Sequence, residues 1–97
     1  PGKRSAFNTL KDVPSVDQGQ SQLNNGDFAA AVDTFTQIIA TNPQNSLVYR
    51  LRGDAYDNLG DQEKALEDWT EAARLGDTVI QSSLDSQGVK WREKPAP

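Results

Sequence analysis

The sequence repeats itself at an offset of 34 residues, and this period constrains the fold more than any other feature of the chain. Besides identities, the offset places Phe35 against Trp69 and Val32 against Leu66, which are similar in size and character. A fixed period of this length is typical of arrays of one supersecondary unit. We therefore expect two copies of a single unit. The identical pairs are Gly19 and Gly53, Asn24 and Asn58, Gly26 and Gly60, Asp27 and Asp61, Ala31 and Ala65, and Thr36 and Thr70.

Each unit is expected to contain two helices. In the second unit, apolar residues three and four apart predict amphipathic helices over about 47–59 and 62–75. Gly60 and Asp61 separate them, because Gly closes a helix in the left-handed conformation and Asp caps the next one. The polar, solvent-facing side of the helix over 62–75 is expected to carry Glu63, Lys64, Glu67, Asp68, Glu71 and Arg74. On that side Lys64 with Asp68, and Glu71 with Arg74, lie at pairing distance.

The first unit has one well-patterned helix, with an apolar stripe from Phe28 to Ile39 that Asn42 and Pro43 end. The helix before it, over about 15–24, has little apolar surface and is expected to be the most labile. A half-apolar fifth helix is expected over about 78–87. The predicted segments are a flexible N-terminal arm (1–11), a first repeat (12–45), a second repeat (46–77), a capping helix with a C-terminal seal (78–91) and a disordered tail (92–97).

Residues 13–79 resemble the tetratricopeptide repeat, a 34-residue helix-turn-helix unit that stacks into a superhelix. The departures are Ser15 and Gln22, where the family prefers aromatics, and Asp77, where it closes with Pro. The resemblance implies an all-α fold, with antiparallel helical hairpins stacked as a short right-handed solenoid of about five helices. The residues that carry it best are Tyr49, Gly53, Tyr56, Gly60, Ala65, Trp69 and Ala72.

The resemblance also implies a concave groove, lined by the first helix of each repeat, that receives a peptide or a partner helix. Gly53 and Ala65 are expected where two helices cross, and Phe35 and Trp69 between hairpins, as packing residues rather than ligand contacts. Asn24 and Asn58 are favoured for contact, because Asn both donates and accepts hydrogen bonds. The predicted groove residues are Val16, Gln20, Leu23, Asn24, Leu47, Arg50, Asp54, Asp57 and Asn58.

The charges in this groove indicate the kind of partner. One subclass of the family clamps a C-terminal carboxylate with Lys and Asn, but here Arg50 is accompanied by Asp54. The two are expected to pair, so that Asp54 repels an incoming carboxylate. We therefore expect a basic or apolar partner and not a C-terminal carboxylate. An interaction scaffold or adaptor is the predicted function.

The composition of the chain disfavours other classes of function. The chain has no Cys and no His, and its carboxylates lie on predicted helix faces, so we expect no enzyme, no metal site and no cofactor. A net charge of −4 disfavours nucleic acid. No run is long enough to span a membrane, which predicts a soluble chain of unknown compartment. Because the sequence starts at Pro1 and lacks Met, the removal of a leader or an anchor is kept as an alternative.

Self-association is the main alternative, since two repeats leave two open ends and about three are needed for an independent array. The chain is then a homo-oligomer or a structural fragment of a longer repeat protein. Trp91 separates the alternatives. It either seals the terminal helix, and is buried in the monomer, or anchors a partner.

Overall fold

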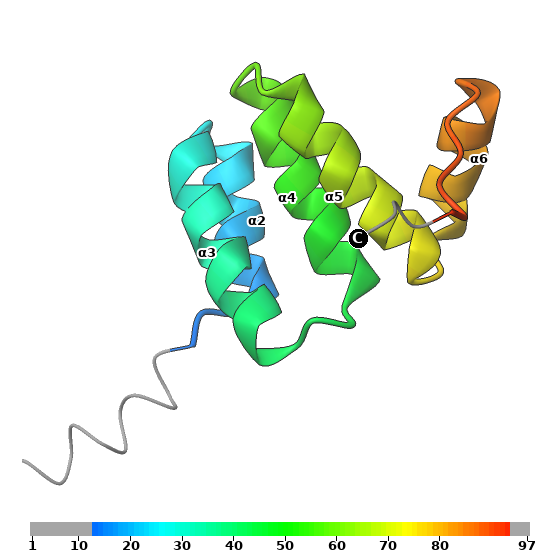
Figure 1. Ribbon diagram of the computed structural model, residues 1–97. Coiled ribbons are helices and arrows are strands. Elements are labelled where there is room, and N and C mark those ends of the chain that lie inside the picture. Colours follow the sequence, from blue (N-terminus) through cyan, green and yellow to red (C-terminus); the bar gives the residue numbers. More distant parts are fainter. Residues whose placement is uncertain (1–12, 94–97) are drawn as a thin grey trace, which may run out of the picture.

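The computed structural model describes residues 13–93, and all of their regular structure is helical (Figure 1). The expectations for residues 1–11 and 94–97 lie outside the described residues. The all-α architecture and the number of helices are confirmed for the described part. The five helices are α2 (Val16–Asn24), α3 (Phe28–Thr41), α4 (Ser46–Asn58), α5 (Gln62–Arg74) and α6 (Thr78–Ser86).

The helices pack in chain order, as a solenoid of hairpins does (Figure 1). α2 and α3 form one antiparallel hairpin, α4 and α5 form the next, and α3 packs against α4 to join them. α6 packs on α5 at the far end. The helices α2, α4 and α6 are therefore the first helices of successive units.

Short polar turns set the helix boundaries. Gly60 and Gly76 follow α4 and α5 with φ of 85° and 110°, a region where a side chain is strained. Asp61 and Asp77 come next, and each side-chain carboxylate accepts the backbone N–H three residues later, at the start of α5 and α6. The closing and capping roles expected of Gly60 and Asp61 are confirmed, and Gly76 and Asp77 have the same roles at the next turn.

A glycine and an aromatic residue interlock within each hairpin. A Cβ built on Gly53 would lie 2.6 Å from Trp69 Cδ1 and Nε1 and 3.2 Å from the Ala65 carbonyl oxygen. A Cβ on Gly19 would likewise overlap the Phe35 ring. Side chains at these positions would force the helices apart, so Gly53 does lie at the crossing of α4 and α5. Phe35 is fully buried in a core cluster with Ala31, Ile38, Val48, Leu51 and Ala55.

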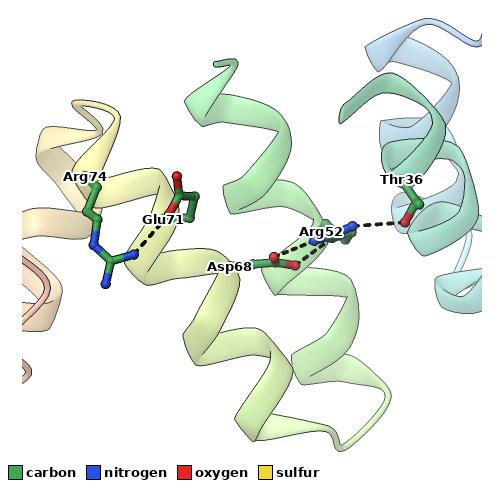
Figure 2. Close-up of polar contacts among 5 residues, drawn as sticks. All are labelled: Thr36, Arg52, Asp68, Glu71 and Arg74. Atoms are coloured by element: carbon green, nitrogen blue, oxygen red, sulfur yellow. Dashed lines mark hydrogen bonds and ion pairs between the residues drawn. The ribbon is translucent and has the colours of Figure 1, made fainter. Parts of the chain in front are cut away.

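A buried ion pair joins α4 to α5, and it corrects one prediction (Figure 2). Arg52 Nε and Nη2 donate to the two Asp68 carboxylate oxygens at 2.8 and 2.7 Å. Arg52 Nη1 also donates to Thr36 Oγ1 of α3 at 3.1 Å. Asp68 is only 5% exposed, so its placement on the solvent-facing side was wrong. The reason is that Arg52 satisfies its charge, which a single-helix pattern cannot reveal.

Two ion pairs were predicted on α5, and one of them is confirmed. Glu71 and Arg74 pair at 3.0 Å, as expected (Figure 2). The pairing of Lys64 with Asp68 was wrong, because Asp68 is held by Arg52 and Lys64 Nζ lies 4.0 Å from Asp61 instead. The Lys64–Asp61 pair is exposed and contributes little to stability.

The segment after α6 folds back onto that helix. Trp91 is 7% exposed and packs with Ala73 and Leu84. Its indole N–H donates to Asp85 Oδ1 at 2.8 Å, and Arg74 Nε donates to its carbonyl oxygen at 3.0 Å. This placement within the chain is the one that a sealing role requires.

Trp91→Ala is expected to loosen α6 locally. Removing the ring leaves Leu84 and Ala73 without their cover and takes the indole donor from Asp85, which keeps only the longer contact with Arg92, whereas the core cluster of α3 and α4 does not include Trp91. Amide hydrogen exchange should therefore accelerate in α6 by on the order of tenfold or more and remain unchanged in α3 and α4. Equal acceleration in all helices would contradict a local role for Trp91.

Candidate functional site

A hollow of about 400 Å³ lies between α2 and α4 and brings together most of the predicted groove residues. Six of the nine contribute to its wall, together with Phe28 and Leu51, which were predicted only as parts of apolar stripes. Phe28 is half-buried and Leu51 is buried in the core, and their place in this wall depends on how the two hairpins meet, which no single-helix pattern contains. The six predicted residues are Gln20, Leu23, Asn24, Asp54, Asp57 and Asn58.

The other three predicted residues lie outside this hollow. Val16 is partly buried and packs against the core cluster. Leu47 is 38% exposed near the start of α4. Arg50 Nη1 pairs with Asp77 Oδ2 at 3.1 Å, so the expected pairing of Arg50 with Asp54 was wrong. The nearest strong partner of Arg50 is the capping residue of α6, which the sequence spacing did not suggest.

Asp54 is held by the core aromatic residue of its own repeat. Trp69 Nε1 donates to Asp54 Oδ1 at 3.1 Å, while Oδ2 accepts no hydrogen bond from the described residues. Burial raises the pKa of Asp54, and the negative charges of Asp57 and Asp77 act in the same direction. The Trp69 hydrogen bond and the charge of Arg50 offset this rise only in part. Asp54 thus keeps an acceptor oxygen open beside the hollow.

Substituting Asp54 by Asn tests the cost of burying this carboxylate. Because the pKa of Asp54 is higher in the folded than in the unfolded chain, its effect on stability is most favourable in acid and is lost as the pH rises through these values. Asp54→Asn keeps an oxygen for Trp69, so the variant should be at least as stable as the wild type at pH 7. The difference in free energy of unfolding between the variant and the wild type should shrink toward pH 3.

Urea unfolding followed by circular dichroism at several pH values measures this difference. Glu67→Gln, at an exposed position of α5, removes the same charge and is the matched control. If Asp54→Asn were less stable than the wild type at pH 7, the carboxylate would be stabilising the fold, and the argument from burial would be wrong.

The two Asn residues of the groove differ in how much bonding capacity they keep. Asn58 Nδ2 donates to the Asp54 carbonyl oxygen of its own helix at 2.8 Å, so one of its N–H groups is already used. The Asn24 side chain makes no hydrogen bond to the described residues. Asn24 therefore keeps its full capacity to donate and accept, whereas Asn58 keeps part of it.

A second, smaller hollow of about 170 Å³ lies between α4, α5 and α6. Its wall combines the Trp69, Ile80 and Leu84 side chains with the polar Ser83 and Gln87, and Asp54 borders it as well as the first hollow. The sequence analysis predicted no site here, because this hollow forms only when α6 packs on α5.

Within residues 13–93, no three or more Asp or Glu side chains gather in a way that would hold a metal ion. The same part of the chain contains no helix that is both long and apolar enough to cross a membrane.

Comparisons with known proteins agree with this architecture. The family model described as "Tetratricopeptide repeat" matches residues 16–79. The chain is 36% identical to tetratricopeptide repeat protein 36 of Danio rerio over 74 residues, which are 73% of this chain and 40% of that protein. It is 33% identical to human tetratricopeptide repeat protein 28 over 63 residues, which are 65% of this chain and 2% of that protein. No solved structure matches the chain significantly.

A third relative is human small glutamine-rich tetratricopeptide repeat-containing protein beta, which is 36% identical over 52 residues. These residues are 54% of this chain and 17% of that protein, so the chain spans less than half the length of each of these relatives. Because the family model covers most of the described residues, the chain belongs to the tetratricopeptide repeat family. It is accordingly a protein-interaction module of scaffold type.

Proposed function

We propose that the chain binds an extended peptide or a partner helix in the groove between α2 and α4, and that the partner presents Lys, Arg or apolar side chains there. The single observation that carries this proposal is the 400 Å³ hollow, whose wall gathers amides and two carboxylates from both repeats. Polar groups that converge on a concave surface can fix the orientation of a bound ligand.

The charge balance of the groove favours a cation. Asp54 and Asp57 lie in its wall, and Asp57 forms no ion pair with the described residues. The adjacent cation, Arg50, is already paired with Asp77. An incoming Lys or Arg gains a charge-assisted hydrogen bond, whereas a carboxylate meets two like charges with no free cation beside them.

Peptides selected from a random display library against the intact chain test this function. The tightest peptide is titrated into the ¹⁵N-labelled chain, and the shifts of backbone and side-chain amides are mapped. We expect the largest changes at Gln20, Asn24 and Asn58. Changes confined to α3 and the outer face of α5, or the recovery of no peptide, would overturn the proposal.

Two charge-reversal variants sharpen the test. Asp57→Lys places a cation in the hollow and should weaken peptide binding by roughly tenfold or more, since like charges are brought together. Glu67→Lys makes the same change on the exposed side of α5 and should alter affinity by less than about twofold. Sedimentation of the same samples detects self-association. A dimer that Asp57→Lys dissociates, without peptide binding, would identify the groove as a self-interface and contradict the proposal.

A further inference from the structure

The second hollow, between α4, α5 and α6, is suited to one apolar side chain. Its wall is mixed: the apolar part comes from Trp69, Ile80 and Leu84, and the polar part from Asp54, Ser83 and Gln87. Its volume of about 170 Å³ exceeds the roughly 150 Å³ of a cavity that accommodates benzene. Filling it would remove apolar surface from water on both sides, which favours an aliphatic occupant.

Asp54 joins this hollow to the groove between α2 and α4. It borders both hollows, and its hydrogen bond to the Trp69 indole fixes one oxygen at the wall of the second hollow. The other oxygen accepts nothing from the described residues. A donor bound to this oxygen would therefore lie close to both hollows, because Asp54 lines each of them.

The wall of the groove also favours an extended occupant. A helix docked in a groove is held by an apolar stripe, but polar amides and carboxylates dominate the wall between α2 and α4. Side-chain amides such as Gln20 and Asn24 suit an extended backbone, whose N–H and C=O groups are free to bond. In an extended peptide, residues i and i+2 point to the same side.

We propose that the chain recognises a peptide motif in which Lys or Arg, bound by Asp54, stands two residues from an aliphatic side chain that enters the Trp69–Ile80–Leu84 hollow. This inference rests on the proposed function and specifies the ligand class of the same groove. α6 thereby takes part in recognition, beyond its contact with α5.

The sequences of the selected peptides give the first test. We expect Lys or Arg separated by one residue from Leu, Ile, Val or Met to be enriched over the unselected library. The tightest peptide is then made with its aliphatic residue replaced by Ala. This change should weaken binding by roughly 15- to 60-fold, since two or three methylene or methyl groups are no longer buried.

The two indole N–H resonances of the chain provide an internal control for this titration. The Trp69 indole lies in the wall of the second hollow, whereas the Trp91 indole donates to Asp85 on α6. Peptide binding should shift the Trp69 resonance and leave that of Trp91 nearly unchanged, with the assignment made from Trp91→Phe. The Ala-substituted peptide should shift Trp69 much less.

Asp54→Asn tests the cationic half of the motif. With the wild-type chain, replacing the peptide Lys or Arg by Gln should weaken binding roughly fivefold. With Asp54→Asn, which retains an acceptor for Trp69, the same replacement should have little effect. Helicity measured by circular dichroism verifies that the variant is folded.

The outcomes separate this inference from the function on which it rests. If peptides shift the amides of α2 and α4 but leave Trp69 unmoved and tolerate the Ala substitution, the groove binds peptides and the inference about the second hollow is wrong. If the loss on replacing Lys or Arg persists in Asp54→Asn, Asp54 is not the recognising group. If no peptide binds, both proposals fail.

Discussion

Asp68→Ala is expected to lower the free energy of unfolding by about 3–5 kcal/mol, because it leaves the Arg52 guanidinium without its counter-charge in a half-buried position. An arginine guanidinium does not lose its proton in proteins, so Arg52 stays charged once Asp68 is gone and cannot relieve the loss by releasing a proton. Small domains are stable by only about 5–15 kcal/mol, so this loss is a large fraction of the total free energy of unfolding. Urea unfolding followed at 222 nm measures the effect.

Lys64→Ala is the matched control for this substitution. It removes the exposed pair with Asp61, whose atoms are 4.0 Å apart, and should change stability by less than about 0.5 kcal/mol. A double variant, Arg52→Met with Asp68→Leu, removes both charges and should recover much of the stability that Asp68→Ala loses. If Asp68→Ala were as mild as Lys64→Ala, the buried pair would not be stabilising the hairpin.

Gly53→Leu is expected to destabilise the chain by roughly 3 kcal/mol, and Gly53→Ala by about 1–2 kcal/mol. The reason is steric, since even a Cβ here would lie 2.6 Å from the Trp69 ring. The direction of the stability change caused by Gly53→Ala is the informative result. In an open helix the change from Gly to Ala stabilises by about 0.5–1 kcal/mol, so a net loss at position 53 requires the close contact.

A double-mutant cycle with Trp69→Leu isolates this contact. When the ring is removed, Gly53→Ala should become much less costly, which gives an interaction energy of the order of 1 kcal/mol. Thermal unfolding of the four proteins supplies the values. An unchanged cost in the Trp69→Leu background would show that the ring does not determine the choice of Gly.

The repeat and the turn residues made the fold predictable from sequence. The 34-residue offset aligned Gly19 with Gly53, and both glycines meet the aromatic side chain that the same offset pairs. Gly60 and Asp61 marked a boundary that the structure reproduces within one residue. The turn residues are local signals and the offset comes from comparing the sequence with itself, so neither requires knowledge of how the helices pack.

Contacts between helices were predicted poorly. Asp68 was assigned to solvent, because it lies among charged residues of α5, but its partner Arg52 is 16 positions away on another helix. Arg50 was matched to Asp54 one turn away, but it reaches Asp77 at the start of α6. Most residues of the groove wall were predicted correctly, because they lie in the first helix of each repeat. The contributions of Phe28 and Leu51 depend on tertiary packing.

The position of Arg52 has a consequence for how the groove meets a ligand. From α4 it bonds to Thr36 in one repeat and to Asp68 in the other, so together with the core cluster around Phe35 it links the neighbouring units (Figure 2). A surface whose curvature is set in advance loses little conformational entropy on association. Recognition by this chain should therefore follow preorganised, lock-and-key behaviour, in which most of the ordering is done by the incoming segment and little by the receptor.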